Sequence, residues 1–234
     1  MIIYCAADRN YFNLYFDLWE KQTSKIYPEL KRHIALHNPT DEAKQKCYDH
    51  LIDFNDITEW FPENPTKNHF YLLRWLYMPY LYQQNILETQ INCLPIKEMN
   101  LPYYKNTNIL ATQINCLAVK TQEFPNIEVE QWRIQRPKRG YLGGVSAAIF
   151  TSKSAEKVVN HAKSLLDNPP LSDHPMNMWQ IENLSQHQEK CEHQIKEKDL
   201  LPEAVLPDYT YWITARTSNT WSHDKKLEAL RKFI

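Results

Sequence analysis

The chain has 234 residues and a formal net charge of -1 at pH 7, so it can bury a substantial core in one large domain or two small ones. The near-neutral balance provides no overall field for nucleic acid or an anionic membrane, and no apolar run approaches the roughly 20 residues of a membrane-spanning helix. Met1 is not followed by a signal-peptide pattern, and five widely spaced cysteines without a CxxC pair indicate reduced thiols, no zinc site and a cytoplasmic location.

The N-terminal part of the chain predicts two strands that alternate with two helices. Apolar β-rich runs indicate strands at residues 1–7 and 32–36. Helical spacing runs from residue 11 to 26 and stops before Pro28, and a second helix follows the capping residue Thr40 to about residue 52. This alternation implies a parallel sheet with crossover helices.

The next segments predict a loop at residues 56–67, an apolar helix at 69–82 and a strand at 85–96. The helix contains one charged residue, Arg74, and Pro79 should end or kink it. On the strand, Gln90 and Asn92 are two residues apart and should point the same way. Glu88 has the same parity, so all three side chains could face one cleft.

An internal repeat includes this strand. Residues 85–97 and 108–120 are identical at ten of thirteen positions, which indicates two neighbouring strands. The second copy has Ala111 where the first has Glu88. If the motif performs chemistry that needs an acid, only the first copy retains it.

The C-terminal part predicts further alternation of strands and helices. Strands are expected at 128–133, 145–150 and 209–215, helices at 154–166, at 172–184 and near the C-terminus, and a solvated charged surface at 187–198. All three glycines lie within residues 140–144, which indicates close backbone approach or a tight turn. We therefore predict an α/β fold: one domain over 1–234 with a mixed, mainly parallel central sheet flanked by helices.

Four of these segments occur in the order found in a known family. Residues 6–11, 71–79, 85–96 and 140–150, with a weaker fifth match at 221–223, resemble motifs of retaining glycosyltransferases with the Rossmann-like GT-A fold. The likeness is greatest to the family-8-like group that includes glycogenin and lipopolysaccharide galactosyltransferases. The resemblance implies transfer of a hexose from a nucleotide-sugar donor, expected to be a UDP-sugar, to a hydroxyl of a glycan or another acceptor.

The resemblance implies a donor-binding role for the turn after the first strand, which contains Ala7, Asp8 and Tyr11. Tyr11 can stack on uracil and Asp8 can accept a hydrogen bond from the base, although Asp8 could instead cap the following helix. Arg74 would reach the donor or orient the metal motif. The alternative for Arg74 is a structural ion pair, with Glu88 as a candidate partner.

Gln90 and Asn92 fall on the Asp-x-Asp metal motif of the family, so the resemblance implies that they hold Mn²⁺ or Mg²⁺ together with His223. Both side chains are uncharged amides, which weakens the expected affinity for the ion. Three alternatives stay open: weak metal binding, metal-free stabilisation of the leaving group by Arg74, Lys225 or Lys226, or Glu88 as the acidic ligand and catalytic residue. A further alternative is a catalytically impaired domain that only binds nucleotide or sugar.

The remaining implied contacts lie in the second half of the chain. Gly143 and Gly144 would allow the backbone to approach the sugar or the acceptor. Asp173 and His174 fall where the family places sugar- and acceptor-contacting residues, and we assign Asp173 a candidate catalytic role. A plain helix cap at Asp173 is the alternative. Lys226 is expected to bind the diphosphate.

Overall fold

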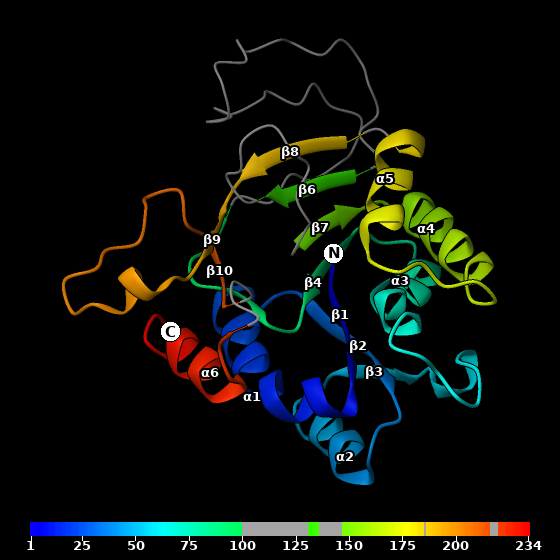
Figure 1. Ribbon diagram of the computed structural model, residues 1–234, viewed down its shortest axis with the longest axis horizontal. Helices are drawn as coiled ribbons and strands as arrows, with labels where there is room; N and C mark the ends of the chain where they lie inside the picture. The colour runs from blue at the N-terminus through cyan, green and yellow to red at the C-terminus, as the bar shows by residue number, and fades with distance from the viewer. Residues whose placement is uncertain (100–130, 136–146, 185, 216–219) are drawn as a thin grey trace.

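The computed structural model describes residues 1–99, 131–135, 147–184, 186–215 and 220–234. They form a seven-stranded sheet and a smaller three-stranded sheet, with helices packed beside them (Figure 1). Strands and helices alternate along the chain, and the large sheet mixes parallel and antiparallel neighbours. The predicted α/β fold with a mixed, mainly parallel sheet is confirmed.

Twenty elements make up the described chain. The strands are β1 (Ile2–Asp8), β2 (Lys31–His37), β3 (Asp53–Asp56), β4 (Ile86–Gln90), β5 (Cys93–Pro95), β6 (Gln131–Gln135), β7 (Ala147–Phe150), β8 (Gln186–Lys190), β9 (Glu192–Gln194) and β10 (Trp212–Thr214). The α-helices are α1 (Arg9–Ile26), α2 (Asp41–Asp49), α3 (Leu73–Leu76), α4 (Ser152–Ser164), α5 (His174–Asn183) and α6 (His223–Arg231). The 3-10 helices are η1 (Thr58–Trp60), η2 (His69–Tyr71), η3 (Tyr80–Tyr82) and η4 (Glu197–Leu200).

The strand order of the large sheet contains a topological switch point between β1 and β4, where the chain changes the side on which it adds strands. The order is β3-β2-β1-β4-β7-β6-β8, in which β3, β2, β1 and β4 are parallel and β7 is antiparallel to both of its neighbours. From β1 the chain first builds outward through β2 and β3, and it then returns to place β4 on the other side of β1. In open α/β sheets, ligands bind at the carboxyl ends of the strands that flank such a switch.

Each face of the large sheet has its own hydrophobic core. Alternate residues of β1 divide between them: Ile3 and Cys5 pack on the face covered by α1 and α6, whereas Tyr4 packs on the face covered by α3, α4 and α5. Figure 1 shows these two groups of helices on opposite sides of the sheet. Helices from both faces of the sheet can therefore contribute side chains at the carboxyl ends of β1 and β4.

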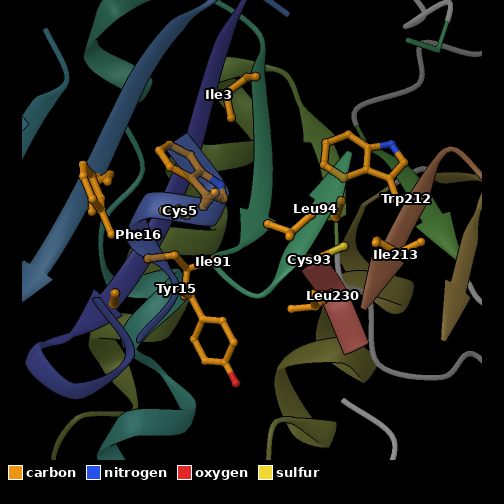
Figure 2. Close-up of a cluster of buried hydrophobic side chains, with 14 of the residues drawn as sticks. Ile3, Cys5, Tyr15, Phe16, Ile91, Cys93, Leu94, Trp212, Ile213 and Leu230 are labelled. Atoms are coloured by element: carbon orange, nitrogen blue, oxygen red, sulfur yellow. The ribbon is translucent and has the colours of Figure 1, made fainter. Parts of the chain in front are cut away.

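The small sheet continues the core on the α1 side. In it, β10 pairs antiparallel with β5 and parallel with β9. Figure 2 shows Leu94 of β5, Ile213 of β10 and Leu230 of α6 in the same buried cluster as Ile3 and Cys5. This packing joins the C-terminal helix to the central sheet. None of the helices in the described residues is long and apolar enough to cross a membrane.

The structure corrects the predicted apolar helix at residues 69–82. The segment contains the short η2, a single turn of α3 and η3, with Tyr77 in an extended conformation between the last two. Pro79 accounts for the break, because proline disfavours helical geometry at the preceding residue and cannot donate a backbone hydrogen bond.

The predicted strand at 85–96 is also corrected. It divides into β4 and β5, which belong to different sheets, and Ile91 and Asn92 form the turn between them. The charged segment at 187–198, predicted as a solvated surface, instead contains strands and the buried residues Cys191 and Ile195. The second repeat copy lies outside the described residues.

Candidate functional site

A cavity of about 520 Å³ opens at the carboxyl ends of β1 and β4, at the topological switch point. Its volume lies within the range of roughly 300–1,000 Å³ that is typical of small-molecule sites. The cavity brings together most of the residues that the sequence predicted for donor or metal binding. These are Ala7, Asp8, Tyr11, Arg74, Gln90, Asn92 and Lys226.

The turn from β1 into α1 supplies one wall of the cavity. Asp8 ends β1, and its Oδ1 accepts a hydrogen bond from the backbone N–H of Tyr11 at 2.8 Å. Asp8 thus caps α1, as the structural alternative proposed, while it also lines the cavity. The cap fixes the first turn of α1, which presents the Tyr11 side chain, 40% exposed, at the edge of the site.

Tyr15 lies one helical turn after Tyr11, and the centroids of the two rings are 5.7 Å apart. Figure 2 shows the Tyr15 ring at the border of the core with its hydroxyl directed away from the other labelled side chains. Burial raises the pKa of Tyr15 to about 12, and the neighbouring Tyr11 adds to this effect. The hydroxyl is therefore protonated at neutral pH.

His223, the predicted metal ligand, begins α6 and packs against these two tyrosines. Its Nδ1 lies 3.3 Å from the Tyr15 hydroxyl, and its ring meets the Tyr11 ring edge-on at a centroid distance of 5.9 Å. His223 is not among the residues that line the cavity. In this arrangement His223 packs behind Tyr11 and Tyr15, which line the cavity.

Arg74 lines the cavity from α3 and forms a two-contact ion pair with Glu88 of β4. The Nε of Arg74 donates to Oε1 of Glu88 at 2.9 Å, and Nη2 of Arg74 donates to Oε2. The carboxylate of Glu88 has no exposed surface, and the Arg74 side chain is 13% exposed. The guanidinium also lies 4.2 Å from the centre of the Trp75 ring. The ion pair considered as the structural alternative for Arg74 is present.

Glu88 therefore lies behind Arg74 and is not among the cavity-lining residues. It is directly opposite Tyr4 in the β1–β4 register. Burial raises the pKa of Tyr4, and the nearby Glu88 charge raises it further. The catalytic role of Glu88 stays a prediction, whereas its contact with Arg74 is a feature of the structure.

Gln90 ends β4 and Asn92 lies in the following turn, yet both side chains line the cavity. Their donor set fits a divalent cation poorly. Gln90 and Asn92 supply neutral amides, and Asp8 supplies the one carboxylate among the described lining residues. No group of three or more His, Cys, Asp or Glu suited to a metal ion occurs in the described parts of the chain.

The structure describes only some of the site residues predicted in the second half of the chain. Gly143 and Gly144 lie outside the described residues, and of His174 the structure describes only the backbone at the start of α5. Asp173 occupies the N-cap position of α5, as the alternative expected, but its backbone is helical and its side chain does not make the capping hydrogen bond. The candidate catalytic role of Asp173 stays a prediction.

Sequence reasoning missed several lining residues. Tyr15 could have been found, because it follows Tyr11 by four residues on one helix. Ala6 and Ile91 are direct neighbours of predicted residues at the ends of β1 and β4. The remaining four lie between Lys67 and Leu73, and their position depends on how that segment folds over the sheet, which no local pattern reveals. The missed residues are Ala6, Tyr15, Lys67, Phe70, Tyr71, Leu73 and Ile91.

Comparison with known proteins shows which solved structures share this architecture. No family model matches the chain, and no curated protein is detectably similar to it in sequence. Solved structures do match. An active-site mutant of LgtC gives a TM-score of 0.56 at 12% sequence identity, covering 99% of this chain and 95% of that one. The galactosyltransferase LgtC in complex with donor and acceptor sugar analogues gives 0.53 at 12% identity, covering 100% and 96% of the two chains.

A glycosyltransferase involved in glycosylation of the major capsid of PBCV-1 matches with a TM-score of 0.50 at 9% identity, covering 99% of this chain and all of that one. The chain has the GT-A fold of glycosyltransferases. This confirms the fold that the sequence motifs implied. Because the sequence identities are between 9% and 12%, the likeness concerns the GT-A fold alone.

Proposed function

We propose that the protein is a glycosyltransferase that moves a hexose from a nucleotide-sugar donor, of which a UDP-sugar is the first candidate, to an acceptor hydroxyl. The observation that carries the proposal is the cavity at the carboxyl ends of β1 and β4, the position where α/β sheets bind nucleotides. The GT-A fold and the size of the cavity support the same ligand class.

The β1–α1 turn is the proposed base and ribose subsite. Tyr11 offers an exposed aromatic face for stacking, and the Asp8 carboxylate can accept hydrogen bonds from an N–H or hydroxyl group. The backbone at Ala7 allows close approach, because its side chain is only a methyl group. The capped start of α1 keeps these three residues in a fixed arrangement.

Arg74 is the proposed contact to the donor sugar or its phosphate, and Glu88 is its positioning residue. A guanidinium held by two carboxylate contacts has little rotational freedom, so its remaining N–H groups point in a defined direction. Gln90 and Asn92 face the same space and can act as both donors and acceptors.

The proposed reaction breaks the bond between the anomeric carbon and the β-phosphate oxygen, and the electron pair stays on that oxygen. A bond forms between the acceptor oxygen and the anomeric carbon, and the acceptor proton passes to the departing diphosphate or to water. Positive groups near the leaving diphosphate lower the barrier, because negative charge develops there in the transition state. The resemblance supports retention of anomeric configuration, which NMR of the product tests.

A donor-turnover assay tests the proposal. The protein is incubated with a panel of nucleotide sugars, with Mn²⁺ or with EDTA, and released nucleoside diphosphate is measured. We expect release from at least one donor, and we expect Asp8→Asn to reduce it while keeping the helix cap. Binding of nucleotide without release from any donor, even with simple sugar acceptors, would favour the impaired alternative. Absence of both binding and release would contradict the proposed function.

A further inference from the structure

We propose that Lys67 and Lys226 hold the donor diphosphate directly, in place of a divalent metal ion. This inference rests on the proposed function and specifies how its leaving group is bound. It starts from a mismatch in the structure: the cavity has the position expected of a metal–diphosphate site, but the chemistry of its lining suits a cation poorly and an anion well.

The two lysines approach the cavity from opposite faces of the sheet. Lys67 precedes η2, whose Phe70 packs with the core on the α3 side. Lys226 belongs to α6, whose Leu227 packs with the core on the α1 side. Both lysines line the same cavity. A ligand that extends across the carboxyl ends of β1 and β4 would therefore have an ammonium group on each side.

The charges of these lysines are not balanced by neighbouring acids. Among the described residues, no carboxylate lies within ion-pair distance of Lys67 or Lys226. Arg74, in contrast, is balanced by Glu88, and among the lining residues that the structure describes Asp8 is the single acid. The diphosphate of a nucleotide sugar carries two negative charges at neutral pH, which the two unbalanced ammonium groups match.

The neighbouring Lys225 has the same charge as Lys226 but points to a different part of the structure. Its ammonium pairs with Glu197 and lies 4.8 Å from the centre of the Trp221 ring, and it does not line the cavity. Of the two adjacent lysines considered from the sequence, the structure directs only Lys226 to the site. Lys225 is therefore a matched control with the same charge.

The amides of Gln90 and Asn92 act in the same direction as the lysines. A carboxylate at either position would repel a phosphate unless a metal ion lay between them. An amide instead carries an NH₂ group that can donate hydrogen bonds to phosphate oxygens. The two amides and the two lysines of the lining therefore favour the same arrangement, direct recognition of the diphosphate.

Calorimetric titration of the intact protein in EDTA tests the inference. The probes are UDP, CDP, GDP and ADP, followed by the nucleoside of whichever base binds best. Substitution of Lys67→Met or Lys226→Met should weaken diphosphate binding about tenfold each, because each removes one charge-assisted contact. Binding of the nucleoside should not change, and Lys225→Met should keep diphosphate affinity within about twofold. Lys67→Arg and Lys226→Arg, which keep the positive charge, should retain most of the affinity.

The outcomes separate this inference from the proposed function. Diphosphate affinity in EDTA that equals the affinity in Mn²⁺, and that falls in both lysine variants, supports it. Binding that requires Mn²⁺, or that survives both Lys67→Met and Lys226→Met, overturns the inference and leaves the proposed function in place. If the diphosphate binds neither in EDTA nor in Mn²⁺, both this inference and the proposed function are overturned. Thermal melting of each variant verifies that it is folded.

Discussion

The ion pair between Arg74 and Glu88 gives the sharpest stability prediction. Glu88→Gln keeps the volume of the side chain and removes its charge, which leaves the guanidinium of Arg74 without its buried counter-charge. The carboxylate of Glu88 is fully buried and the arginine side chain is 13% exposed, so water can compensate little. Breaking such a pair costs about 3–5 kcal/mol, and we expect about 3 kcal/mol because glutamine can still accept one hydrogen bond.

Urea unfolding followed by tryptophan fluorescence measures this loss. For a chain of this length, about 3 kcal/mol corresponds to a fall of roughly 6–12 °C in Tm. The double variant Glu88→Gln with Arg74→Met should recover most of the stability, since no unpaired charge is left in the core. Asp17→Asn is the control, because it removes the exposed pair of Asp17 with Lys46, and such pairs contribute only about 0–1 kcal/mol.

A Glu88→Gln protein that unfolds within about 0.5 kcal/mol of the unchanged protein would refute this reasoning. The same result would show that the guanidinium is compensated elsewhere or exposed to water. A double variant that is less stable than Glu88→Gln alone would also refute it. In that case Arg74 would stabilise the fold through contacts other than the ion pair.

Three further predictions concern single contacts. Asp8→Ala should lower the free energy of unfolding by about 1 kcal/mol through loss of the 2.8 Å cap to Tyr11, whereas Asp8→Asn should retain it in the same denaturation assay. Thr89→Val should cost about 1–3 kcal/mol by leaving the buried Trp19 Nε1 without its acceptor at 3.0 Å, and Thr89→Ser should not. Burial lowers the pKa of His33 below 6.5. The folded protein therefore holds His33 neutral, and its stability should fall as the pH drops below the pKa of the unfolded chain. His33→Phe should reduce the fall in Tm between about pH 7 and pH 5.

Local signals in the sequence were sufficient for the first part of the fold. The strand that ends at Asp8, the helix cap and the helical spacing from Tyr11 all depend on neighbouring residues, and all three are present. The requirement that a charged residue in an apolar segment needs a partner led correctly from Arg74 to Glu88. These patterns depend on residues close in sequence or on one buried charge.

The remaining features depend on tertiary placement. A single strand was predicted over residues 85–96, whereas the structure divides this segment into β4 and β5. The turn at Asn92 arises because the following strand pairs with β10, more than one hundred residues later. Lys67 carries no local signal at all, and it reaches the cavity only because the segment before α3 folds over the sheet. The single domain and the cytoplasmic location stay predictions.

A crystal structure of the protein with a bound nucleoside diphosphate, grown in EDTA, tests the central claim most directly. We predict that the ligand occupies the cavity at the carboxyl ends of β1 and β4, with its base against Tyr11 and its phosphates between Lys67 and Lys226. A ligand bound elsewhere on the molecule would contradict the claim. So would a diphosphate in this cavity that contacts neither lysine.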